Sequence, residues 1–152
     1  MQILNGSTIQ VNQRVYLLDT NVVSEIRKKE RANKGVRAFF DRAAKEDIDL
    51  YLSVVTVGEL RRGVEIIRHR GDTAQTTSLE TWLTAMLDDF AQNILPIDAD
   101  IGQLSGRLRV PHAENALDKM IAATGLIHDL IVVTRNVDDF LPTGVRVFNP
   151  FE

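Results

Sequence analysis

The feature that most constrains the fold is a short apolar segment that ends on a carboxylate, since Val15–Leu18 is followed directly by Asp19. An apolar run of about four to eight residues bounded by polar ones is typical of a buried strand in a parallel α/β sheet. Asp19 would then lie at the carboxyl end of the strand, where open α/β sheets bind ligands. Asp19 or Asn21 also suits the N-terminal cap of a following helix. Both interpretations stand at this point.

The composition limits the classes of protein to which the chain can belong. Its 152 residues, 44% of them hydrophobic, suit one domain with a sizeable core. The absence of cysteine excludes disulfides, zinc–thiolate sites and cysteine nucleophiles. No apolar run approaches the ~20 residues of a membrane span, and the polar start is unlike a signal peptide, so we expect a cytoplasmic protein without a membrane partner. The net charge of −3 argues against a protein that coats nucleic acid by charge alone.

Apolar periodicity predicts strands that alternate with helices, which indicates a single α/β domain. We interpret residues 1–14 as a loose N-terminal extension and residues 15–152 as the domain. In helix 116–128 the apolar stripe is predicted to contain Leu117, Met120, Ile121 and Ile127, and the stripe with Trp82 and Phe90 is predicted to be core or a dimer contact. The later strands are expected at 50–54, 94–97, 130–133 and 145–148, and the helices near 21–29, 36–45, 56–69, 78–90, 99–108 and 116–128.

Acidic residues recur at the predicted strand ends and helix starts. Asp19 and Asp139 follow the two most apolar strands, and Glu59 and Asp118 are expected in the first turns of helices. Singly, each has a structural explanation as a cap or a helix-dipole partner, worth ~0.3–1 kcal/mol, and Thr56 with Glu59 matches a capping box. Gathered in one cleft, however, the four carboxylates would repel one another unless a cation neutralised them.

The type of cation follows from the available ligands. Because the chain has no cysteine and no histidine cluster, the cation would be a hard one, Mg²⁺ or Mn²⁺, held through oxygen. Such a metal activates water and stabilises the charge of an in-line displacement at phosphorus. The acids are therefore suited to phosphoryl chemistry.

Four segments carry these acids, and their order and spacing are specific. They are Leu17–Asn21, Ser53–Gly63, Leu117–Thr124 and Thr134–Phe140. In this order they resemble the successive motifs of PIN-domain nucleases, most closely the VapC and FitB type of toxin from bacterial toxin–antitoxin pairs. The resemblance runs from residue 15 to about residue 150. The residues before Val15 depart from it, because family members usually begin close to the first strand.

The resemblance implies a fold, an activity and a set of site residues. The fold would be a PIN-like three-layer α/β sandwich with a central, mainly parallel sheet, and the activity that of a metal-dependent endoribonuclease. Asp138 and Asp139 leave the fourth acid ambiguous, and we favour Asp139 because the family's acid directly precedes the aromatic residue. The implied catalytic residues and ligands of Mg²⁺ or Mn²⁺ are Asp19, Glu59, Asp118 and Asp139, with Thr134 and Asn136 in supporting positions.

The resemblance also implies RNA as substrate, a homodimer, and a cognate antitoxin protein that blocks the cleft. Arg61 and Arg62 follow Glu59 by less than a helical turn, so either one is a candidate to bind a phosphate of the substrate. A solvated helix face is the alternative for both.

Two other functions remain open. A haloacid-dehalogenase-like phosphatase also places an Asp after its first strand. That family has a second Asp two residues later, where this chain has Asn21. A non-enzymatic PIN-like scaffold is the other alternative. Such scaffolds tend to lose their acids, and this chain has all four.

Overall fold

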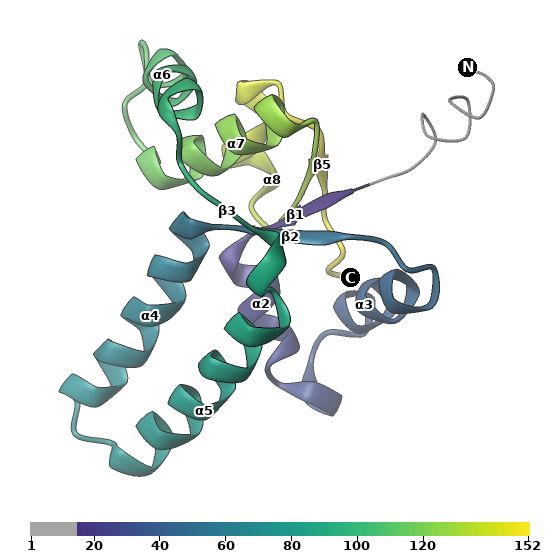
Figure 1. Ribbon diagram of the computed structural model, residues 1–152, viewed down its shortest axis with the longest axis vertical. Coiled ribbons are helices and arrows are strands. Elements are labelled where there is room, and N and C mark those ends of the chain that lie inside the picture. Colours follow the sequence, from purple (N-terminus) through teal and green to yellow (C-terminus); the bar gives the residue numbers. More distant parts are fainter. Residues whose placement is uncertain (1–14) are drawn as a thin grey trace.

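The centre of the molecule is a five-stranded sheet with the order β3-β2-β1-β4-β5 (Figure 1). The structure, a computed structural model, describes residues 15–152, so the expected extension over residues 1–14 lies outside the described part. Every neighbouring pair of strands is parallel. The strands are β1 (Tyr16–Leu18), β2 (Leu50–Ser53), β3 (Ile94–Leu95), β4 (Ile131–Val133) and β5 (Val147–Phe148).

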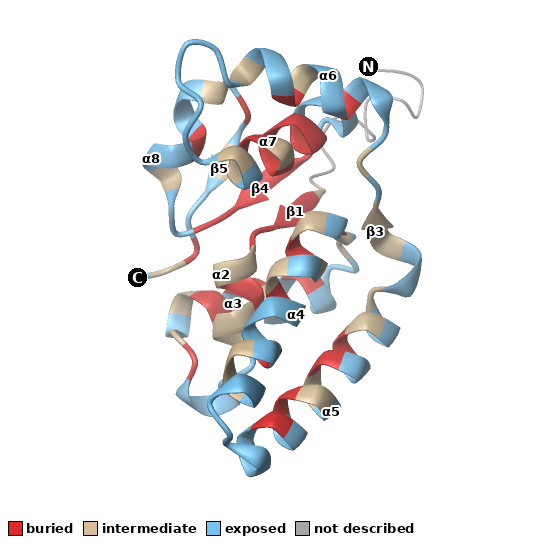
Figure 2. Cartoon of the chain, turned by 90° about the vertical axis from the view of Figure 1, so that its left-hand side faces the viewer, coloured by how far each residue is buried: buried red, intermediate tan, exposed pale blue. Residues whose placement is uncertain are grey.

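Helices cover both faces of this sheet and complete three layers (Figures 1 and 2). The layer on one face contains α2 (Thr20–Ile26), α3 (Lys34–Lys45), α4 (Val54–His69) and α5 (Thr73–Asp89). The layer on the other face contains α6 (Ala99–Leu108), α7 (Ala116–His128) and the short α8 (Val137–Phe140). None of the helices within residues 15–152 is long and apolar enough to cross a membrane. The three-layer α/β fold expected from the sequence is confirmed.

The two central strands are buried on both faces because their apolar side chains alternate between the layers. Leu17 of β1 packs toward α7, where it joins the cluster that contains Ile121. Its neighbour Leu18 packs toward the opposite layer with Val22 and Phe39. One strand therefore holds both helical layers, which explains why this short run is apolar throughout.

The register between the central strands places two polar residues side by side. Leu18 of β1 lies opposite Val133 of β4, and the backbone N–H of Asp19 donates to the Val133 carbonyl at 2.9 Å. Asp19 and Thr134 therefore leave the sheet together at its carboxyl edge. The two most apolar strands, β1 and β4, are thus neighbours in the sheet.

Helix α4 begins two residues earlier than the expected Thr56. It begins at Val54, because the Ser53 hydroxyl caps it by accepting a hydrogen bond from the Val55 backbone N–H at 3.0 Å. Glu59 consequently lies in the second turn of the helix, not the first. The capping-box explanation of Glu59, and its predicted place in the first turn, are both wrong.

Helix α5 also begins earlier than expected, at Thr73 instead of near Ser78. Asp72 caps it by accepting from the Gln75 backbone N–H at 3.0 Å. The first turns contain threonines, whose hydroxyls bond to carbonyls one turn back along the same helix, as that of Thr77 does. These polar turns show no apolar stripe, so periodicity alone did not find them.

The apolar stripe predicted for α7 is wrong in part. Leu117 and Ile127 are 47% and 45% exposed, and the face against the sheet consists largely of small side chains that include Ala122 and Ala123. At Gly125, an added Cβ would lie 2.9 Å from Val145 Cγ2. Small residues let the helix approach the sheet closely, and this contact decides which face is buried.

The stripe with Trp82 and Phe90 on and after α5 belongs to the core. Both side chains are half-buried and pack against the cluster that contains Leu79 and Leu83. Of the two interpretations predicted for this stripe, the structure therefore supports a core role.

We expect Gly125→Ala to destabilise the fold, because the new methyl group would press on Val145 and on Val132, whose Cγ2 lies 3.2 Å from the added Cβ. Overpacking of this kind costs about 1–3 kcal/mol. Urea denaturation measures the change. The control is Gly102→Ala within α6, where no atom lies within 4 Å of the added Cβ and a gain of about 0.5–1 kcal/mol is expected. A Gly125→Ala variant as stable as the parent would contradict the close packing of α7.

Candidate active site

Asp19 is a buried carboxylate held by three hydrogen bonds at the end of β1. Its side chain is 3% exposed. One oxygen, Oδ1, accepts from the Thr20 backbone N–H at 2.8 Å. The other, Oδ2, accepts from the Thr134 hydroxyl at 2.8 Å and from the Asn21 amide at 3.2 Å. A carboxylate has about four acceptor positions, so Asp19 keeps one free while it also caps α2.

Thr134 and Asn136, the predicted supporting residues, lie in this network with different roles. The Thr134 hydroxyl contacts Asp19 directly and accepts from the Asn136 backbone N–H at 2.9 Å. Asn21 links the two strands further, because its amide oxygen accepts from the Arg135 backbone N–H at 3.1 Å. The sequence presented Asn21 only as a possible cap, and nothing in its spacing revealed this bridge.

Glu59 reaches the same edge of the sheet from the second turn of α4. Its Oε1 accepts a hydrogen bond from the Thr20 hydroxyl at 2.5 Å. Thr20 is the first residue of α2 and follows Asp19 directly. The contact therefore ties the acid on α4 to the end of β1. Thr20 was not found from the sequence, where the only signal is a hydroxyl next to the first acid.

Asp118 lies in the first turn of α7, within range of the negative charges of the other three acids. Burial, with a smaller contribution from the negative charges of Asp19, Asp139 and Glu59, raises the pKa of Asp118 to about 6. Unlike Asp19, it receives no hydrogen bond from any group within residues 15–152 that would oppose these effects. The charge of Asp139 acts on Asp118, and the choice of Asp139 over Asp138 as the fourth acid stays a prediction.

The pKa of Asp19 is also raised, mainly by burial. Hydrogen bonds from Thr134, Thr20 and Asn21 oppose this effect, whereas the charge of Glu59 adds to it. The site therefore contains two carboxyls whose ionised forms are disfavoured by their surroundings. A cation would relieve both.

The donor set suits a hard cation that keeps part of its water shell. No group of three acidic or histidine side chains in the described part of the chain forms a ready-made metal cage. Mg²⁺, however, is usually held by one or two carboxylates plus waters. The free position on Asp19 and the partly exposed Asp118 offer carboxylate oxygens of this kind.

Lys119, next to Asp118, has a buried side chain that was not predicted from the sequence. It is 7% exposed, and its ammonium group donates to the backbone carbonyls of His112 and of Glu114, the latter at 2.7 Å. These bonds fix the loop that precedes α7. A lysine inside an otherwise apolar helical run was the signal that could have revealed it.

Arg61, a candidate for substrate binding, is engaged elsewhere. Its guanidinium pairs with Glu80 at 2.7 Å and with Glu65 at 3.1 Å, so its donors connect α4 to α5. Arg62 is exposed on the same helix. The structure therefore gives Arg61 a structural partner and leaves Arg62 on a solvated face.

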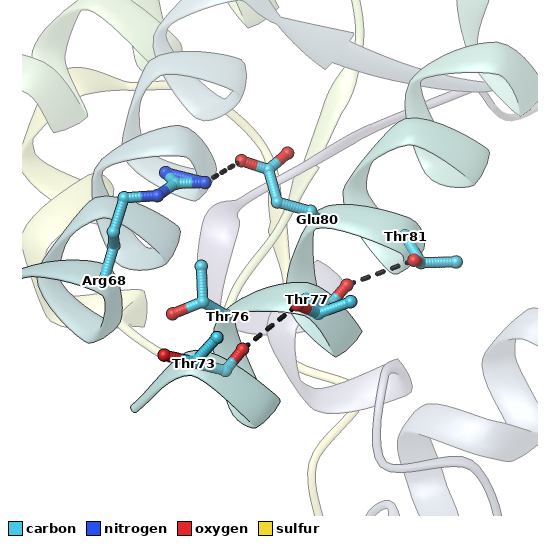
Figure 3. A pocket seen from close by; sticks show the side chains of 6 residues that line it. All are labelled: Arg68, Thr73, Thr76, Thr77, Glu80 and Thr81. Carbon is cyan, nitrogen blue, oxygen red and sulfur yellow. Dashed lines mark hydrogen bonds and ion pairs between the residues drawn. The ribbon is translucent and has the colours of Figure 1, made fainter. Parts of the chain in front are cut away.

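A pocket of about 360 Å³ between α4 and α5 is a poor candidate for a site (Figure 3). Its Arg68 pairs with Glu80 at 2.5 Å. The hydroxyls of Thr77 and Thr81 donate to carbonyls of their own helix, both at 3.1 Å. The polar groups that line this pocket are thus largely satisfied without a ligand.

The comparison with known families agrees with this geometry. The sequence matches the family profile described as PIN domain over residues 16–142. The chain belongs to the PIN-domain family. This assignment separates it from the haloacid-dehalogenase-like phosphatases considered above.

Individual relatives match nearly the whole domain. The chain is 36% identical over 140 residues to Toxin FitB of Neisseria gonorrhoeae, covering 89% of this chain and 97% of that protein. It is 33% identical over 142 residues to VapC ribonuclease Y4jK of Sinorhizobium fredii, covering 90% and 97%. The crystal structure of FitAcB from Neisseria gonorrhoeae superposes with a TM-score of 0.77 at 37% identity, covering 90% of this chain and 98% of that chain.

We expect Asp118→Asn to stabilise the metal-free protein at neutral pH. Because folding raises the Asp118 pKa from 3.8 to about 6, the native state binds more protons than the unfolded state between these values. The free energy of unfolding therefore falls as pH rises through this window. Removing the charge should raise stability at pH 7.5 by about 1 kcal/mol, a figure discounted for partial exposure.

Urea denaturation in EDTA at several pH values from 4 to 7.5 measures this effect. Asp138→Asn is the matched control, and its effect should stay within about 0.5 kcal/mol. If Asp118→Asn kept the parental dependence on pH and the parental stability, the raised pKa of Asp118 would be wrong.

Proposed function

We propose that the protein is a metal-dependent endoribonuclease, the toxin component of a bacterial toxin–antitoxin pair, that hydrolyses RNA phosphodiester bonds. The observation that carries the proposal is the arrangement at the carboxyl end of β1, where three hydrogen bonds hold Asp19 and the adjacent Thr20 donates to Glu59. The relatives named as a toxin and as a ribonuclease support the choice of RNA. An RNA substrate is consistent with action in the cytoplasm.

The proposed cation is Mg²⁺ or Mn²⁺, held by oxygens of Asp19, Glu59, Asp118 and Asp139. When bound, it would offset the negative charge and activate a water for attack on the phosphodiester. Asp19 is suited to this role because three hydrogen bonds fix its orientation. Glu59 has a second oxygen that receives no hydrogen bond from the described residues.

The protein groups around the acids would keep the site ordered in the absence of substrate. Thr134 and Thr20 donate to Asp19 and Glu59 respectively, so these two carboxylates need little reorganisation to bind a cation. Asp118 lacks such donors, and because its pKa is raised, a nearby positive charge would favour its ionised form. A non-enzymatic scaffold would have no use for this unfavourable arrangement.

The proposed antitoxin would cover a hollow that contains Glu59. This hollow, of about 230 Å³, lies between α2, α4 and α5, and its lining includes the apolar side chains Leu60, Ile67 and Trp82 together with Arg27. A protein segment seated here would bury apolar surface and reach the acidic edge. Such binding would block RNA.

We also propose a homodimer, on the basis of the family resemblance. Trp82 and Phe90 are half-buried against the core, so only their exposed parts would be available to the interface. Light scattering at micromolar concentration should give twice the chain mass of 17.1 kDa. A monomer mass under these conditions would contradict the proposal.

The main test of function is RNA cleavage by the purified protein. We expect cleavage of single-stranded RNA with Mg²⁺ or Mn²⁺ and none in EDTA, because the acids need a cation to organise the attacking water. Glu59→Gln and Asp118→Asn should each lower the rate by on the order of 100-fold or more. Asp41→Asn, at an exposed acid of α3, is the control and should cleave at nearly the parental rate. Cleavage that persists in EDTA would refute the proposed chemistry.

A further inference from the structure

Arg135 places a cation at the edge of the acidic site. It directly follows Thr134, and its backbone is fixed by the hydrogen bond to Asn21. Its exposed guanidinium lies over the ring of Phe151, with 3.9 Å between Cζ and the ring centroid. This is a cation–π contact, since the separation is well within the ~6 Å range of such interactions.

The segment that carries Phe151 is anchored against the start of α3. Asn33 donates from its amide to the Glu152 carbonyl at 3.0 Å and accepts from the Glu152 backbone N–H at 3.3 Å. At Gly35, an added Cβ would lie 2.0 Å from the Pro150 carbonyl oxygen, so this segment packs directly on the helix backbone. The ring of Phe151 is therefore held in place independently of Arg135.

The guanidinium of Arg135 has no ion-pair partner within residues 15–152. This distinguishes it from Arg61, whose donors are engaged by Glu80. Together with Asn136 and Asp139, Arg135 lines a polar hollow of about 290 Å³. Hydrogen bonds from Lys28 and Asn33 lower the pKa of Glu25, and the charge of Arg135 adds to this effect from beyond ion-pair distance. Arg135 and Asp139, one of the proposed ligands, line the same hollow.

We propose that Arg135 binds a phosphate of the RNA strand next to the scissile bond, and that Phe151 positions its guanidinium for this contact. The inference rests on the proposed ribonuclease function. Arginine suits the task because its planar fork can donate two hydrogen bonds to one phosphate. Stacking on Phe151 covers one face of the guanidinium and leaves the donors at its edge available.

The acidic site has a physical need for such a residue. Asp138 and Asp139 line the hollow, and their charges repel an RNA backbone. The fixed guanidinium of Arg135 beside them attracts the strand and sets its register, and the acids would hold the metal ion that supplies the chemistry at the phosphate to be cleaved. Arg135 should therefore contribute to substrate binding more than to the chemical step.

Steady-state RNA cleavage with Mg²⁺, at several salt concentrations, tests this role. Arg135→Ala and Arg135→Gln should raise KM by on the order of tenfold and change kcat by less than about twofold, because the phosphate contact is made in both the ground and the transition state. The slope of log KM against log salt should fall by about 0.7, the value for one contact to a single strand. Arg135→Lys should recover part of the affinity. The control is Arg42→Ala, an exposed arginine in the last turn of α3, with parental kinetics.

Substitution of Phe151 separates positioning from packing. Phe151→Leu keeps an apolar side chain but removes the ring face, so KM should rise by less than in Arg135→Ala. Phe151→Tyr keeps the ring and should retain the parental KM. Melting temperatures of all variants show whether a change in KM follows from loss of stability.

The possible failures are distinguishable. A parent protein that neither binds nor cleaves RNA refutes the proposed function, and this inference with it. A parent that cleaves RNA while Arg135→Ala and Arg135→Gln keep its KM and salt dependence overturns the inference alone. The same holds if these variants lower the melting temperature or kcat but leave KM unchanged.

Discussion

The hydrogen bond between the Thr134 hydroxyl and Asp19, at 2.8 Å, is the interaction on which the arrangement of the site depends. It joins the ends of the two central strands at a position where both residues are buried. A carboxylate there is costly unless its oxygens are satisfied, and Thr134, Thr20 and Asn21 provide the donors. The same bonds fix how β1 continues into α2. One set of hydrogen bonds thus satisfies the buried oxygens of Asp19 and also orients Asp19 as a proposed metal ligand.

This central pair also connects segments that are distant in the sequence. Thr20 donates a hydrogen bond to Glu59 of α4, and Asn21 accepts one from the backbone N–H of Arg135. Arg135 in turn contacts Phe151 near the start of α3. The polar network therefore links most of one helical layer to the carboxyl edge of the sheet. On the other face, Asp118 comes from α7 with few polar contacts of its own.

The sequence predicted the central strands well, because they are a local signal, whereas the role of the acids as ligands stays a prediction. The run Val15–Leu18 can bury its side chains only in a covered sheet, and Asp19 follows it at once. Features that depend on tertiary contacts were missed or misjudged. Ser53 displaced Thr56 as the cap of α4, and close packing at Gly125, not the apolar pattern, decided which face of α7 is buried. The buried Lys119 is satisfied by backbone carbonyls that no sequence pattern reveals.

The origin of the acids in different layers has a mechanical consequence. Asp19 extends from the sheet, Glu59 from the layer that contains α4, and Asp118 from the layer that contains α7. Protein cores are close-packed and transmit small displacements, so a shift of either layer by a fraction of an ångström alters the separation of the carboxylates. Substitutions in either of the two hydrophobic clusters therefore change the distance between the carboxylates. The spacing of the acids responds to the packing of both clusters before the protein unfolds.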